Sequence, residues 1–261
     1  MSKMQFATQM FTIRDFTKDR AGLEESLRKI AEMGYPAVQM SAVGAMNGAP
    51  PEVDAADARA LLDKYSLQCI ATHRPLDRLM ENADAEVDFH KTLGCDYVAI
   101  GGIPGEQTVD AYRQFLKDAA PMIRTFKEAG IRFGVHNHDK EFARPDVDGP
   151  SLMDVLIDEG GDDLYLELDL YWIQHAGVNP VRVLERCPGR VPVIHIKDKA
   201  VVIGEGPVMA PIGMGNLDWE HVLPACREAG VDWVAVEQDI CRWDAFDCLK
   251  SSLEYLNSRE W

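Results

Sequence analysis

Polar side chains that can do chemistry gather in four short segments of the second half of the sequence. Each segment lies at the end of an apolar stretch: HNHDKEF at 136–142, LELDLYW at 166–172, HIKD at 195–198 and VEQD at 236–239. Carboxylates together with imidazoles are ligands that Mn²⁺, Mg²⁺, Zn²⁺ and Co²⁺ take in proteins. The same groups transfer protons as acids and bases. These segments can form one site only if the fold brings them together.

The elements that would position these segments alternate along the whole chain. Eight short stretches rich in apolar or β-branched residues are predicted to be strands: 6–10, 37–41, 68–73, 97–102, 132–138, 164–169, 192–197 and 233–238. Amphipathic helical patterns separate them, as at Leu23, Leu27 and Ile30. Short strands that alternate with helices indicate a parallel sheet within one α/β domain.

The connections between these elements indicate a closed barrel. Turns from a helix into the next strand are short and contain a glycine, at Gly34, Gly94, Gly130 and Gly230. Longer polar segments follow strands, at 42–54, 139–150 and 199–216. An open doubly wound sheet would usually carry a glycine-rich phosphate turn after its first strand, where this chain has FTIR. We therefore predict that residues 1–261 form a single (β/α)8 TIM barrel, whose active face is built by the loops after the strands.

Alternation within the strands decides which side chains enter the barrel. Glu237 faces inward because the valines beside it face the helices, and His195 and Lys197 face inward between two isoleucines. Asp169 faces inward by the same argument, and Glu167 is expected to be structural, deeper in the barrel. Repulsion among buried carboxylates is offset by a divalent cation, so Asp169, His195 and Glu237 are predicted metal ligands. Taken singly, either carboxylate could instead pair with Lys197, and His195 could be a hydrogen-bonded interior histidine.

Bulk composition limits the partners and the compartment. The formal net charge of −16 weighs against nucleic acid and anionic membranes, although a small phosphorylated substrate stays possible. Apolar runs fall short of the roughly 18 residues that span a bilayer, and the N-terminus lacks a secretory signal pattern. We expect a cytoplasmic protein whose six scattered cysteines are reduced and mostly buried. His90 and His221 lie on helical stretches and are expected at the surface or in caps.

At these motifs the sequence resembles the xylose-isomerase-like barrel superfamily of sugar isomerases and epimerases, over nearly its whole length. The likeness is greatest to the branch with an HNHxxEF signature at 136–142, and QHAG at 174–177 and GMGNLDW at 213–219 support it. Keto-sugar epimerases, inosose dehydratase and enzymes that cleave 3-keto-glycosides are related to this branch.

The resemblance implies one divalent metal ion, most often manganese, with magnesium, zinc or cobalt as alternatives. Its implied ligands are Glu141, Asp169, His195 and Glu237. Many sugar epimerases place the first of these glutamates on strand five, where this chain has His136. His136 or His138 can therefore take the place of Glu141.

The resemblance also implies a reaction on a keto-sugar. A base removes the proton next to the carbonyl, and the metal ion stabilises the resulting enediolate. Glu141 and Glu237 are the candidate catalytic groups, with His138 as an alternative base and Lys197 as a ligand of a substrate oxygen. The implied substrate contacts are His73, His136, Trp172 and His175. A lyase that eliminates water or an aglycone from a 3-keto-sugar or a 3-keto-(C-)glycoside is the alternative to an isomerase or epimerase.

Two other functions stay open. Endonuclease IV shares the superfamily, but its trinuclear zinc site and basic DNA-binding face fit poorly with seven histidines and a charge of −16. Some relatives that cleave keto-glycosides pair with a second small chain, so a barrel subunit that depends on a partner is also possible. We expect a carbohydrate substrate, and either a homo-oligomer or a second small subunit.

Overall fold

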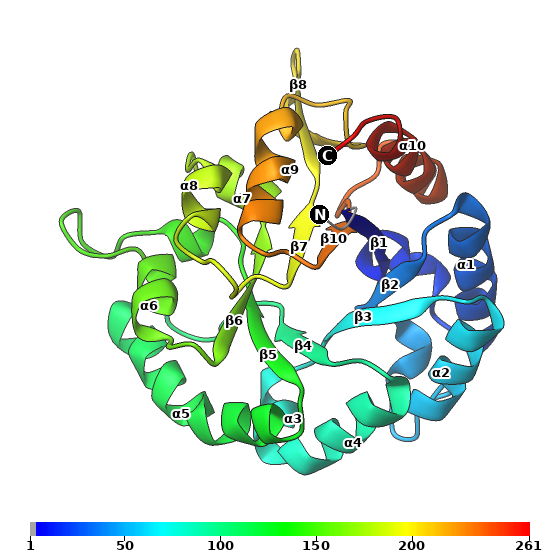
Figure 1. Cartoon of the computed structure of the whole chain (residues 1–261), viewed down its shortest axis with the longest axis horizontal. Helices are drawn as coiled ribbons and strands as arrows, with labels where there is room; N and C mark the ends of the chain where they lie inside the picture. Colours follow the sequence, from blue (N-terminus) through cyan, green and yellow to red (C-terminus); the bar gives the residue numbers. More distant parts are fainter. Residues whose placement is uncertain (1–3) are drawn as a thin grey trace.

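The structure, a computed structural model, describes residues 4–261, and in this range eight parallel strands close into one barrel (Figure 1). The order around the barrel is β1-β10-β7-β6-β5-β4-β3-β2. The barrel strands are β1 (Gln5–Gln9), β2 (Ala37–Met40), β3 (Gln68–His73), β4 (Tyr97–Ile100), β5 (Arg132–His136), β6 (Leu164–Asp169), β7 (Val193–Ile196) and β10 (Trp233–Val236). The predicted TIM barrel is confirmed, with each predicted strand ending within two residues of the observed one.

Helices surround the barrel as an outer layer (Figure 1). They are α1 (Arg20–Met33), α2 (Ala55–Lys64), α3 (Leu76–Glu81), α4 (Ala83–Leu93), α5 (Val109–Glu128), α6 (Leu152–Glu159), α7 (Leu170–His175), α8 (Pro180–Leu184), α9 (Trp219–Glu228) and α10 (Ala245–Asn257), with short 3₁₀ helices η1 (Met10–Phe16), η2 (Gly44–Met46) and η3 (Lys140–Phe142). Local signals fix their ends. Asp19 caps the start of α1 by accepting a hydrogen bond from the N–H of Gly22, and Gly34 ends this helix at a φ of 97°.

The strands divide their side chains between two apolar layers, as the alternation predicted. Ile194 and Val234 belong to the large core between barrel and helices, whereas Val193 and Ala235 belong to a small core inside the barrel. Tyr97 fills much of this interior. Its hydroxyl group lies over a glycine of the neighbouring strand β5: a Cβ on Gly134 would lie 2.0 Å from the hydroxyl oxygen of Tyr97.

An antiparallel hairpin follows β7, and it corrects the prediction that 199–216 is a loop. It consists of β8 (Asp198–Val202) and β9 (Gly206–Ala210), and it projects beyond the barrel beside α9 in Figure 1. The sequence did not reveal these strands because both are short and mostly outside the core. Arg242, in the segment after β10, forms an ion pair with Glu205 in the turn of the hairpin at 2.6 Å.

The prediction of a surface or capping role was wrong for His90. This histidine is fully buried, with Nε2 2.7 Å from the hydroxyl of Thr72 and Nδ1 2.6 Å from the carbonyl of Glu86. His221 is exposed beside Asp218, as predicted.

The six cysteines are free and, apart from Cys241, buried. Among residues 4–261, the helices are either too short or too polar to cross a membrane.

Candidate active site

The carboxyl ends of the barrel strands surround a pocket of about 380 Å³. Its lining combines two aromatic walls, three histidines and three charged side chains: Phe11, Trp172, His73, His136, His138, Lys197, Glu237 and Asp239. These residues follow or end strands β1, β3, β5, β6, β7 and β10. The structure therefore brings the polar segments of the second half of the chain to one mouth, as predicted.

Three buried atoms converge near the pocket floor. Oδ2 of Asp169, Nδ1 of His195 and Oε2 of Glu237 offer ligand atoms within 4.8 Å of one another, and no backbone N–H or hydroxyl group of the described residues donates a hydrogen bond to them. Asp169 pairs in register with His195, so their side chains leave β6 and β7 at the same height. Two carboxylates and one imidazole that converge on one point are a set of ligands that suits a divalent metal ion.

Lys197 lies at the same convergence. Its ammonium nitrogen is 2.8 Å from Oδ2 of Asp169, 3.0 Å from Oε2 of Glu237 and 2.8 Å from Oδ1 of Asp239. Burial alone would lower the pKa of Lys197, but these three carboxylates outweigh it and raise the pKa above its ordinary value. The single ammonium leaves a surplus of negative charge that a divalent ion would balance. The pairing with Lys197 and the metal site are thus compatible.

Glu167 is the centre of a second cluster, one layer deeper in the barrel. Its Oε2 contacts Nε2 of His73 and lies 3.3 Å from Nε2 of His195 and 3.5 Å from Nδ1 of His136. Burial would raise the pKa of Glu167, but the neighbouring imidazoles, first those of His73 and His195, hold it far below its usual range. Glu167 therefore stays ionised and orders the histidines around it. The sequence had indicated only a structural carboxylate here.

Gln39, on β2, joins this cluster to the predicted ligand His195. Its Nε2 donates a hydrogen bond to Oε1 of Glu167 at 2.9 Å, and its Oε1 lies 2.7 Å from Nε2 of His195. Because the Gln39 oxygen can only accept, His195 carries a proton on Nε2 and turns Nδ1 toward Asp169 and Glu237. Sequence reasoning missed Gln39, although a polar residue at an inward position of a buried strand was a usable signal.

His136 and His138 occupy different places in the site. His136 is buried at the end of β5, with Nε2 3.9 Å from Oδ2 of Asp169. Burial, followed by the charge of His195, lowers its pKa well below the ordinary value. His138 lines the pocket, and its buried Nδ1 has no hydrogen-bond partner among the described residues. Burial lowers the pKa of His138 as well, so its ring is neutral at neutral pH.

The pocket lining in the described chain includes neither Glu141 nor His175. Glu141 is buried, with Oε2 accepting a hydrogen bond from the backbone N–H of His138 at 2.8 Å and Oε1 from the hydroxyl of Tyr112 at 3.2 Å. These contacts make Glu141 a support of the HNH segment. His175 is exposed, and its ring packs against Trp172, with centroids 5.2 Å apart.

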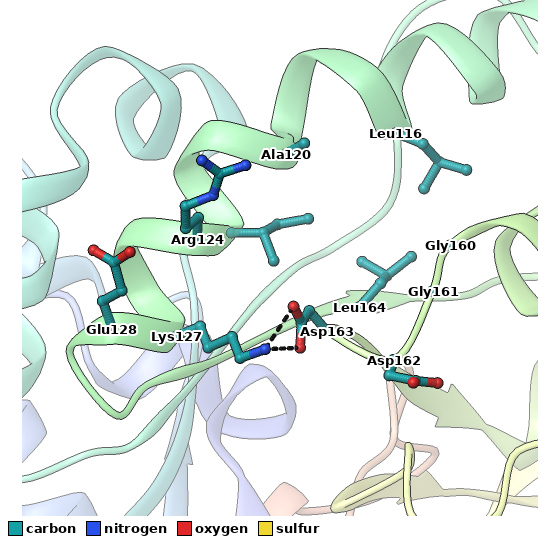
Figure 2. A pocket seen from close by; sticks show the side chains of 11 residues that line it. Leu116, Ala120, Arg124, Lys127, Glu128, Gly160, Gly161, Asp162, Asp163 and Leu164 are labelled. Atoms are coloured by element: carbon teal, nitrogen blue, oxygen red, sulfur yellow. Dashed lines mark hydrogen bonds and ion pairs between the residues drawn. The ribbon is translucent and has the colours of Figure 1, made fainter.

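A larger hollow, of about 560 Å³, lies away from this chemistry. Figure 2 shows it between α5 and the turn from α6 into β6, where Lys127 pairs with Asp163 at 2.7 Å. The residues of this turn precede β6, so the hollow lies at the opposite end of the barrel from the mouth. It contains no convergence of buried ligand atoms among the described residues.

Comparison with known proteins places the chain in a family. A family model for the xylose isomerase-like TIM barrel matches residues 27–259, so the chain belongs to this family. No curated protein matches it in sequence.

Solved structures show the same fold at low identity. A sugar phosphate isomerase/epimerase from Parabacteroides distasonis ATCC 8503 superposes with a TM-score of 0.81 at 22% identity, over 99% of both chains. The probable 3-DHS dehydratase AsbF from Bacillus anthracis gives 0.75 at 13% identity, over 98% of this chain and 100% of the other. The IOLI protein with a binding zinc atom gives 0.72 at 15% identity, over 98% of this chain and 97% of the other. Isomerase/epimerase and dehydratase barrels are thus among the structural neighbours.

Proposed function

We propose that the protein is a divalent-metal-dependent isomerase or epimerase of a keto-sugar. The observation that carries this proposal is the convergence of three buried ligand atoms, from Asp169, His195 and Glu237, beneath a pocket that also holds a charged lysine. Membership of the xylose isomerase-like family supports it.

Asp169, His195 and Glu237 would hold the ion, with manganese as the first candidate. His136 is the nearest candidate for a fourth ligand, since its Nε2 faces Asp169 whereas Glu141 is engaged elsewhere. When bound, the ion would stabilise the negative charge that develops on the substrate carbonyl oxygen as the neighbouring carbon loses its proton.

The chain supplies the proton transfer and the orientation of the sugar. His138 is the favoured base, because its ring lines the pocket and its Nδ1 has no hydrogen-bond partner among the described residues. Burial lowers the pKa of this imidazole, so the ring is neutral at neutral pH and can accept a proton. Glu237 is the second candidate, since it also lines the pocket. Lys197 stays charged and donates a hydrogen bond to a substrate oxygen, while Trp172 presents an apolar face to the sugar ring.

Metal analysis followed by an exchange assay tests this function. The purified protein should contain, or take up, about one Mn²⁺, Zn²⁺, Co²⁺ or Mg²⁺ per chain. The loaded protein should then move solvent deuterium into the carbon beside the carbonyl of at least one member of a panel of keto-sugars and 3-keto-glycosides. An isomer or epimer as product supports the proposal, and loss of water or an aglycone would identify the lyase instead.

The same assay separates the competing functions. Three zinc ions per chain and no exchange would favour the nuclease. Activity of the isolated chain would show that no second small subunit is needed. A metal-loaded protein that exchanges no proton in any sugar would contradict the proposed function.

A further inference from the structure

Asp198, the first residue of β8, occupies a cradle of backbone N–H groups. Its carboxylate accepts hydrogen bonds from the N–H groups of Gly213 at 2.8 Å, Gly215 at 3.0 Å and Leu217 at 3.2 Å, and from Nε1 of Trp219 at 2.9 Å. Successive N–H groups that point at one anion form the arrangement that binds phosphate in many proteins. The loops after strands seven and eight of a TIM barrel are a frequent phosphate site. Here a side chain of the protein fills that cradle.

The cradle leaves no room for a second anion. Asp198 is fully buried, and a Cβ on Gly215 would lie 2.2 Å from its Oδ1, so the backbone closes directly around the carboxylate. A substrate phosphate could enter only by expelling Asp198 from its hydrogen bonds, which leaves a buried charge without partners.

The charges of the pocket also disfavour an anionic substrate. Lys197 is shared by three carboxylates, so one divalent ion brings this group to neutrality and leaves no positive surplus. Two further cations, Arg14 and Lys140, are not among the described residues that line the pocket. Arg14 donates to the carbonyl oxygens of Phe11 and Asp239, and Lys140 lies 3.7 Å from the carboxylate of Glu141.

We infer that the substrate is an uncharged sugar or glycoside and not a sugar phosphate. This inference rests on the proposed function and names the substrate class of the same site. The apolar faces of Phe11 and Trp172 suit the C–H face of a neutral ring, and the histidines and Lys197 suit its hydroxyl and carbonyl oxygens.

Matched pairs of substrates test the inference on the wild-type protein. D-Fructose is compared with D-fructose 6-phosphate, and D-ribulose with D-ribulose 5-phosphate, by calorimetric binding to the Mn²⁺-loaded protein and by deuterium exchange. We expect each neutral sugar that binds to do so at least about tenfold more tightly than its phosphate ester, which corresponds to roughly 1.4 kcal/mol. Equal or tighter binding of the phosphate esters would overturn the inference while leaving the proposed function intact. A metal-loaded protein that binds no sugar of either kind would contradict both.

Two charge variants locate the origin of the preference. Asp198→Ala empties the cradle, so inorganic phosphate should bind to this variant and not to the wild type; Asp198→Ser, whose short side chain also frees the N–H groups, serves if the alanine variant does not fold. Asp239→Asn should narrow the preference for neutral sugars. Glu128 is an exposed acid at the opposite end of the barrel, and Glu128→Gln changes the net charge by the same amount. This control variant should leave the preference for neutral sugars unaltered. Inorganic phosphate that displaces a bound sugar from the wild type would overturn the inference.

Discussion

Nδ1 of His195 lies 2.9 Å from Oε2 of Glu237, the residue directly after the neighbouring barrel strand β10. Burial would lower the pKa of His195, but the carboxylates of Glu167 and Glu237 outweigh it and raise the pKa to about 9. The same nitrogen is therefore a site for a proton or for a metal ion, and the two compete. This relationship makes Glu237 the most direct test of the site.

Glu237→Gln should remove metal binding and leave the fold intact. The amide keeps the shape of the carboxylate but removes its charge, so the ammonium of Lys197 faces only the carboxylates of Asp169 and Asp239, and the negative surplus that attracts the ion is smaller. We expect metal affinity to fall by more than the roughly 10–100-fold that loss of an outer hydrogen-bond partner costs. Calorimetry with Mn²⁺ and circular dichroism measure the two effects, and Glu220→Gln, an exposed residue of α9, is the control. Normal turnover by Glu237→Gln would refute the assignment.

Gln39→Leu should weaken metal binding without touching a ligand. The substitution removes both the donor to Glu167 and the acceptor from His195, so the ring of His195 is no longer held in one tautomer. Metal affinity should fall about 10–100-fold, and above pH 9, where the ring of His195 is neutral, its ¹⁵N signals should show a mixture of tautomers. Gln68→Leu, at the exposed start of β3, should change neither quantity. An unchanged ¹⁵N spectrum in Gln39→Leu would show that Gln39 does not orient the ring.

Glu86 should contribute to stability in a pH-dependent way. Burial would raise its pKa, but Arg74 and then Arg78 outweigh it and lower the pKa below 4.5. A lowered pKa means that this carboxylate stabilises the fold fully above pH 4.5, and that the contribution is lost as pH falls through the lowered value. Glu86→Gln should cost about 3 kcal/mol at pH 7 and should flatten the loss of stability in acid, as measured by urea unfolding from pH 7 to 3. Glu24→Gln, which breaks an exposed pair with Lys64, should cost far less stability than Glu86→Gln, because solvent screens that pair; a similar loss in both variants would contradict the prediction.

Gly134→Ala should strain the interior of the barrel. The added methyl group would lie 2.0 Å from the hydroxyl oxygen of Tyr97, and the rigid ring cannot move aside. Overpacking of this kind costs about 1–3 kcal/mol. Tyr97→Phe removes the oxygen, so the double variant should recover part of the loss, and a thermodynamic cycle from urea unfolding measures the coupling. Independent, additive effects would show that the two residues do not compete for the same space.

The alternation within strands made most of the barrel and three of the site residues predictable. Asp169, His195 and Glu237 could be placed at one mouth because each lies on a short buried strand whose apolar neighbours fix its direction. Side chains alternate between the two faces of a strand, so a shift of the strand by one residue would move every side chain from the barrel interior to the helix-facing layer, or the reverse. The apolar neighbours therefore fix the direction of these three residues.

Contacts across the barrel interior could not be predicted in the same way. Gln39 and Glu167 lie on opposite strands, β2 and β6, and nothing in either local pattern says that their side chains meet. His90 was wrongly predicted to lie at the surface because its helix, α4, packs against α2 and α5 as well as against the barrel. Such a helix buries side chains on more than one of its faces. The position of Glu141 was likewise set by Tyr112 and the turn after β5, which the motif does not encode.

The two halves of the barrel contribute different kinds of residue to the lining of the pocket. Most of the titratable side chains in the lining come from the segments that end β5, β6, β7 and β10, whereas Phe11, Ser41 and Gly101 come from the segments that follow β1, β2 and β4. If the proposed function holds, exchange of the segments after β1, β2 and β4 should change the preference among substrates, with the atoms that would hold the ion left in place.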